Sequence, residues 1–175
     1  MTHPHDEAAR GGGVYLGRAA AREAVALVAP MMESALGRRD VVGSGFLYVV
    51  VMDPAREAGE ASFDEAVLYE QGFGDRTQWD ADYAAFARAK ARLSWLTGRD
   101  GRTVQALLPH LLRDGDTALS GGVCLDGIVV GVSGAFPEFD ELFAGAVALA
   151  LRALARQARQ ADKATTLRAS AERTG

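Results

Sequence analysis

The sequence predicts a single α+β domain in which helices pack on a largely antiparallel sheet. Short apolar runs rich in β-branched residues indicate buried strands, and a two-residue hairpin signal joins two of them. Longer segments in which apolar residues recur every three or four positions indicate helices packed on that sheet. The 175 residues suffice for one core. We expect the domain to span residues 14–158, with a flexible N-terminal tail over 1–13 and a frayed or disordered C-terminal tail over 159–175.

The first helix is expected over residues 15–36 and to stop at Gly37. Its small and large apolar residues form one stripe at helical spacing, made of Leu16, Ala20, Ala24, Leu27, Met31 and Ala35. Pro30 removes a backbone donor inside this pattern, so a kink or break is expected there. Met31 and Met32 are expected in the core.

Two strands are expected next. Residues 46–52 are continuously apolar and bounded by Gly-Ser-Gly and Asp-Pro, which is typical of a central strand covered on both faces. Residues 65–71 form the second strand, and a hairpin between the two is plausible because neighbours in sequence are often neighbours in a sheet.

The second half of the chain predicts a helix, a hairpin and a final helix. The helix covers residues 79–96, and a short apolar segment interrupted by Pro109 follows at 104–112. Strands at 117–125 and 128–133 flank Asp126-Gly127, a strong hairpin signal. Pro137 can open the last helix, whose core stripe is expected at Phe139, Phe143, Val147, Ala150 and Leu154.

Composition excludes several classes of protein. A net charge of −4 argues against a dedicated nucleic-acid binder, and a charged fraction of 24% is ordinary for a soluble globular protein. The N-terminus lacks an apolar signal region and no apolar run approaches membrane-spanning length, so we expect a cytoplasmic protein without a membrane partner. One Cys excludes a disulfide scaffold.

Three segments resemble the GlcG/HbpS-like family of haem-binding domains, which is related to the C-terminal part of PduO-type proteins. The most specific segment begins a strand with Gly-Gly-Val, turns at Asp-Gly, ends the next strand with Gly-x-Ser-Gly and continues into a helix with an acidic start. The similar residues are Val49-Val50-Val51-Met52-Asp53, Ala87-Arg88-Ala89-Lys90-Ala91-Arg92, Gly121-Gly122-Val123, Asp126-Gly127, Gly131-Val132-Ser133-Gly134-Ala135 and Asp140-Glu141. Cys124 stands where the family has Pro, and Pro54 follows Asp53 where it usually has a Gly pair. These departures mark a divergent member.

The resemblance implies a profilin-like α/β/α architecture with a five-stranded, largely antiparallel sheet. It also implies assembly into homodimers or higher homo-oligomers. The function that it implies is binding of haem or another small ligand, with a haem-degrading or sensory role as an extension.

His110 is the best-placed haem ligand within the expected domain, because it lies between Pro109 and Leu111 in an apolar stretch. The alternative is a partly exposed His packed by its neighbours. His3 and His5 fall in the expected tail. Cys124 is expected to be a small buried hydrophobe rather than a thiolate ligand, since no basic neighbour in sequence would lower its pKa.

Lys90 shares a helix face with apolar residues. It either reaches an acidic ligand such as a haem propionate or snorkels to water. Gly134 precedes a helix N-terminus and could present backbone N–H groups to an anion, whereas the alternative is a tight strand-to-helix turn. With the neighbouring Ser133 and the Gly121-Gly122 pair, these residues complete the candidate ligand site.

Two functions remain open. One is a haem or small-ligand binding protein of the GlcG/HbpS-like type. The alternative is a non-catalytic oligomerisation or protein-interaction module without haem, for which the many Ala of the long helices would permit close packing. The sequence shows no catalytic triad, no paired catalytic carboxylates and no metal-ligand spacing, which favours a protein that is not an enzyme.

Overall fold

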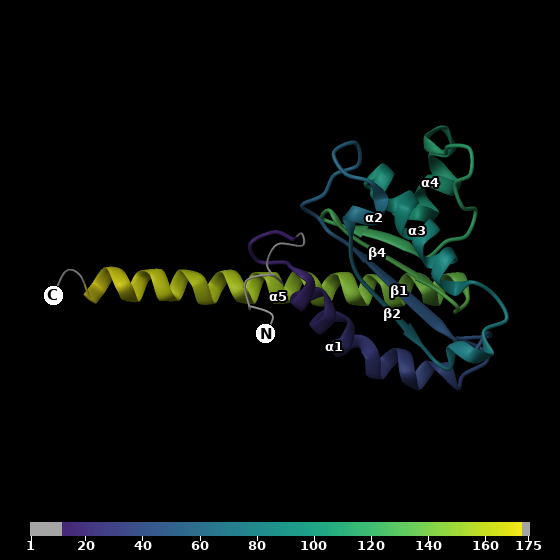
Figure 1. Ribbon diagram of the computed structural model, residues 1–175, viewed down its shortest axis with the longest axis horizontal. Coiled ribbons are helices and arrows are strands. Elements are labelled where there is room, and N and C mark those ends of the chain that lie inside the picture. Colours follow the sequence, from purple (N-terminus) through teal and green to yellow (C-terminus); the bar gives the residue numbers. More distant parts are fainter. Residues whose placement is uncertain (1–11, 173–175) are drawn as a thin grey trace, which may run out of the picture.

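The computed structural model describes residues 12–172, which form helices on both sides of one sheet (Figure 1). The helices are α1 (Arg18–Leu36), α2 (Phe63–Ala66), α3 (Tyr83–Thr97), α4 (Gly101–Leu107) and α5 (Pro137–Glu172). The strands are β1 (Leu47–Met52), β2 (Val67–Phe73), β3 (Gly122–Leu125) and β4 (Ile128–Ser133). Two short 3₁₀ turns, η1 (Arg76–Gln78) and η2 (Pro109–Leu111), lie in the connections.

The sheet has the order β2-β1-β4-β3 and every neighbouring pair is antiparallel. This confirms an α+β fold with an antiparallel sheet. In the described residues the sheet has four strands, whereas the resemblance implied five. Asp126 and Gly127 both have positive φ at the β3–β4 turn, as expected for a tight hairpin.

The strand expected over 117–125 is shorter than predicted, since β3 begins at Gly122. Gln105 on α4 donates from Nε2 to the carbonyl oxygens of Thr117 and Leu119, which ties this segment to the helix instead of the sheet. Gly121 then turns the backbone with φ +129°. Side-chain capture of these carbonyls is a tertiary effect that strand propensity does not register.

The two faces of the sheet carry different cores. Val49, Val51 and Val132 pack with α1 and α5, whereas Val50 and Val129 pack with α3. This alternation follows from the two-residue period of a strand. At Gly131 an added Cβ would lie 2.5 Å from the carbonyl oxygen of Ala87, so the absent side chain lets α3 approach the sheet.

The apolar stripe predicted for α1 is partly wrong. Met32, Val25 and Val28 are buried, whereas Leu27 is 61% exposed and Met31 is 41% exposed. Ala24 and Ala35 of the predicted stripe are buried as expected. The buried face is shifted by about one residue beside them, so that Val28 and Met32 occupy the core in place of Leu27 and Met31. Pro30 lies inside a continuous helix, so the expected break is absent.

Helix α5 leaves the body of the molecule and continues to Glu172 (Figure 1). The tail predicted over 159–175 is therefore helical as far as that residue, and residues 173–175 lie outside the described part, as do residues 1–11 of the predicted N-terminal tail. Tyr15 donates from its hydroxyl to Asp162 at 2.6 Å, which fixes the helix beyond the predicted boundary. None of the helices in residues 12–172 has the length and apolar character needed to cross a membrane.

Candidate functional site

A buried charged cluster lies where α3, the end of β4 and the start of α5 meet. Lys90 Nζ lies 2.7 Å from Asp140 Oδ2 and donates to the carbonyl oxygen of Val132 at 3.1 Å and to Ser133 Oγ at 3.3 Å. The whole residues Lys90, Asp140 and Ser133 are at most 4% exposed. The ammonium group is thus enclosed by partners from the chain itself. Snorkelling of Lys90 to water, as the sequence suggested, is wrong.

Burial raises the pKa of Asp140 from 3.8 to about 6. The charge of Lys90 and its hydrogen bond oppose this effect, as does the backbone N–H of Ala135, which donates to Oδ1 at 3.0 Å. The desolvation of the carboxylate outweighs these favourable contacts.

The predicted anion niche at the start of α5 is filled from within the chain. The N–H of Ala135 binds the carboxylate of Asp140, and the N–H of Phe136 donates to the carbonyl oxygen of Val41. Gly134 serves as a tight turn with φ +126°, and its carbonyl oxygen accepts from the hydroxyl of Ser44. The strand-to-helix alternative therefore describes Gly134 better than an anion site does.

The candidate glycines lie against the same cluster. An added Cβ on Gly121 would lie 2.8 Å from Cβ of Asp140 and 3.0 Å from Cδ of Lys90. The backbone of Gly122 lies against the carbonyl group of Lys90. The structure thus brings together Lys90, Gly121, Gly122, Ser133 and Gly134, and packs them as a closed structural junction.

His110 lies apart from this cluster, on a lobe formed by α4, η2 and the loop to β3, defined here as residues 101–120. The side chain of His110 is exposed. Four large apolar side chains of the same lobe are also exposed to solvent: Leu107 (74%), Leu111 (36%), Leu112 (38%) and Leu119 (47%). Sequence reasoning found His110 but not this apolar surface around it.

Backbone and side-chain contacts hold the lobe in shape. Gln105 binds the carbonyl oxygens of Thr117 and Leu119 and accepts from the hydroxyl of Ser120 at 3.1 Å. Asp116 accepts from the backbone N–H of Arg113 at 2.7 Å. The leucines are thus exposed on a framework held by hydrogen bonds within the lobe.

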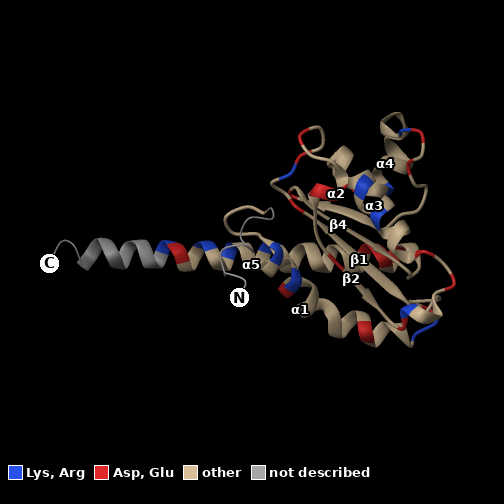
Figure 2. Cartoon of the chain, viewed as in Figure 1, with Lys and Arg blue, Asp and Glu red and all other residues tan. Residues whose placement is uncertain are grey.

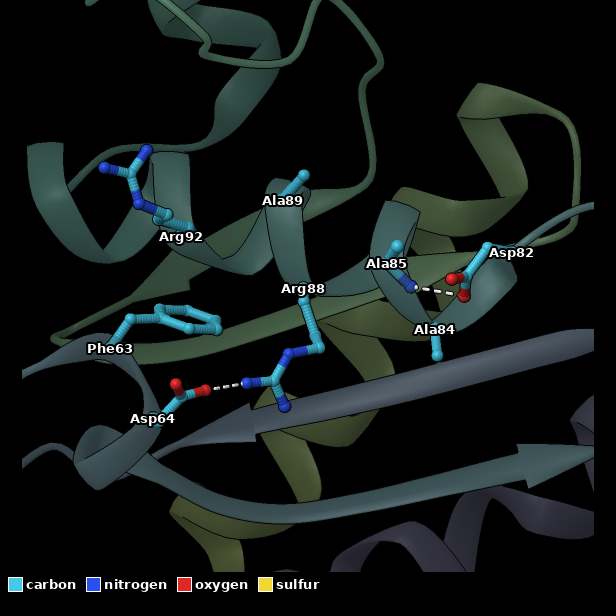
Figure 3. A pocket seen from close by; sticks show the side chains of 8 residues that line it. All are labelled: Phe63, Asp64, Asp82, Ala84, Ala85, Arg88, Ala89 and Arg92. Carbon is cyan, nitrogen blue, oxygen red and sulfur yellow. Dashed lines mark hydrogen bonds and ion pairs between the residues drawn. The ribbon is translucent and has the colours of Figure 1, made fainter.

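A hollow of about 470 Å³ lies over the outer side of α3 (Figure 3). Its walls include Phe63 and three alanines of α3, Ala84, Ala85 and Ala89. Two arginines one turn apart border it. Arg88 is paired with Asp64 and with Glu70, and Arg92 Nη1 lies 3.2 Å from Asp116 Oδ1. These carboxylates already match the cationic charge, so the hollow shows no unpaired cation for an anionic ligand.

Cys124 is half-buried in β3, and burial raises the pKa of its thiol. A raised thiol pKa disfavours the thiolate that ligates metals, in agreement with its interpretation as a small hydrophobe. Among the side chains that the structure describes, residues 12–163, no group of three or more His, Cys, Asp or Glu is arranged to hold a metal ion. No protein-family model and no curated protein sequence matches the chain.

Proposed function

We propose that the chain is a cytoplasmic haem- or small-ligand-binding protein of the GlcG/HbpS-like type, with the 101–120 lobe as its binding surface. The observation that carries this proposal is the exposed His110 within a lobe of four exposed leucines. A solvent-exposed group of large apolar side chains is typical of a surface that binds an apolar partner or ligand.

The residues of the lobe fit haem in their chemistry. Imidazole is a common axial ligand of haem iron, and leucine side chains suit the apolar faces of a porphyrin. Arg113, three residues after His110, is exposed and supplies a cation of the kind that binds carboxylates such as propionates. When bound, haem would supply an iron centre for redox, sensory or haem-degrading chemistry, while the lobe would hold and orient it.

A hemin titration followed by visible absorbance tests this function. The wild-type protein is expected to give a saturable shift of the Soret band, which His110→Ala abolishes or weakens at least about tenfold in affinity. The matched control is a His3→Ala/His5→Ala double variant, which should bind like the wild type. The absence of any saturable shift, or its loss only in the control, would contradict the proposal.

The second candidate is a homo-oligomeric module without haem. It is favoured by exposed apolar side chains on the outer surface of α1 and α5, namely Leu27, Met31, Leu142 and Leu149. Met31 and Leu142 border one hollow of about 220 Å³ between these two helices. Light scattering tests it, since a monomer at about 100 μM would contradict a stable oligomer.

A further inference from the structure

Helix α5 contains a glycine that no contact among the described residues explains. Gly145 lies in the helix interior, where glycine is less favourable than alanine because it loses more backbone freedom on folding. In the part of the chain that the structure describes, an added Cβ at this position would meet no heavy atom of another element within 4 Å, unlike the crowded Gly131. Space around Gly145 is thus open, and the lack of a side chain there leaves the helix backbone accessible from outside.

The residues around Gly145 form an exposed apolar surface. Leu142 precedes it by three positions and Leu149 follows it by four, and both leucines are 50% exposed. This spacing places all three on the same side of the helix. The adjacent Ala146 is small, so a second helix could approach closely between the two leucines.

This pattern is self-complementary in an antiparallel arrangement. When two copies of α5 cross antiparallel with Gly145 of one opposite Ala146 of the other, Leu142 of each copy falls opposite Leu149 of the other. The small residues then meet at the centre and the leucines at both sides. Such an isologous contact buries the same surface on each subunit.

The charges along this side of α5 also favour an antiparallel second copy. Glu138 lies in the first turn, and Arg156 lies beyond Leu149, where further basic residues follow along the helix (Figure 2). In the register above, Glu138 falls within one helical turn of Arg156 of the second copy. An antiparallel pair therefore brings opposite charges together, whereas a parallel pair would bring like charges together.

We propose that the α5 face, defined as Leu142, Gly145, Ala146 and Leu149, is an antiparallel docking surface for α5 of a second copy of the chain. The proposal rests on the second candidate function and specifies its interface. Met31 of α1, which borders the same hollow as Leu142, extends the apolar surface beside it.

Sedimentation velocity and light scattering of substituted proteins test this interface. Gly145→Leu and Leu142→Arg are expected to raise the dimer dissociation constant at least about tenfold. Leu107→Arg is the matched control, since it also places a cation at an exposed leucine, and it should dimerise like the wild type. Circular dichroism verifies that each variant keeps the wild-type helix content.

Charge reversal tests the antiparallel register separately. Glu138→Arg and Arg156→Glu should each weaken self-association, because like charges then meet at both ends of the pair. A mixture of the two variants should recover association as a hetero-pair, since both contacts again join opposite charges. A wild-type monomer would overturn both the interface and the second function. An oligomer unaffected by all of these substitutions would overturn the interface alone.

Discussion

Lys90 on α3 and Asp140 in the first turn of α5 form a buried ion pair, with Nζ 2.7 Å from Oδ2. The two helices lie on opposite faces of the sheet, so the pair joins the layers at the end of β4. Ser133 and the carbonyl oxygen of Val132 complete the coordination of the ammonium group. We infer that this junction fixes how the last helix leaves the sheet.

Removing one partner of this pair is predicted to destabilise the protein strongly. Lys90→Met leaves the carboxyl group of Asp140 buried without its cation, which is expected to lower the free energy of unfolding by about 3–5 kcal/mol. The double variant Lys90→Met/Asp140→Leu should recover more than half of that loss, because no charge then remains buried. Urea unfolding measures both values. A single variant as stable as the wild type would contradict the structural role.

The raised pKa of Asp140 predicts a specific dependence of stability on pH. Its pKa in the folded state, about 6, lies above the ordinary value of 3.8, so the folded protein binds this proton more tightly than the unfolded chain. The stabilising contribution of protonated Asp140 to the free energy of unfolding is therefore fully present below about pH 4 and is lost as the pH rises through about 6. Lys90, the backbone N–H of Ala135 and the neighbouring Glu141 are the charged and polar groups that bear on this carboxyl.

Comparison with Asp140→Asn isolates this contribution. Between about pH 4 and pH 7, the free energy of unfolding of the wild type should fall relative to that of the variant by roughly 2 kcal/mol. Urea unfolding at several pH values gives the difference. A difference that is constant, or that changes with the opposite sign, would show that burial does not govern this carboxyl.

A side chain at Gly131 is predicted to force α3 away from the sheet. The added Cβ in Gly131→Ala would lie 2.5 Å from the carbonyl oxygen of Ala87 and 2.7 Å from the amide nitrogen of Ala91. We expect the free energy of unfolding to fall by about 1–3 kcal/mol, as measured by urea unfolding. Gly37→Ala is the matched control, because its Cβ would meet nothing within 4 Å and its φ is −79°. Equal effects of the two substitutions would contradict the close-packing argument.

The thiol of Cys124 is predicted to react slowly. Burial raises its pKa and limits access, so alkylation by iodoacetamide at about pH 8 should be several-fold slower in the folded protein than in urea. Mass spectrometry of quenched samples follows the reaction. Alkylation as fast in the folded state as in urea would refute the buried-hydrophobe interpretation.

Sequence reasoning was most successful where a pattern is local. The β-branched run at 46–52, the strand at 128–133 and the Asp126-Gly127 turn carry their own signals, and β1, β4 and their hairpin follow them closely. The C-terminal end of the fold was missed for a physical reason. Leu167 is the single large apolar residue between Arg156 and Glu172, but the alanines, glutamines and basic residues of this segment have the helix propensity that continues α5.

The candidate site depended on contacts that spacing does not reveal. Lys90 and Asp140 are 50 positions apart, so nothing local predicts that one neutralises the other. The rotation of α1 that exposes Leu27 and Met31 likewise depends on packing against the sheet and α5. His110 could be selected from the sequence, but the exposure of its four neighbouring leucines required the tertiary fold.

Hydrogen exchange measured with and without hemin tests the proposed function most directly, because it reports both binding and its location. Amides of the 101–120 lobe should exchange more slowly when hemin is present, and this protection should vanish in His110→Ala. Peptides from the β1–β2 pair should be unchanged and serve as the internal reference. Unaltered exchange in the lobe at saturating hemin, or protection confined to another segment, would contradict the assignment of the site.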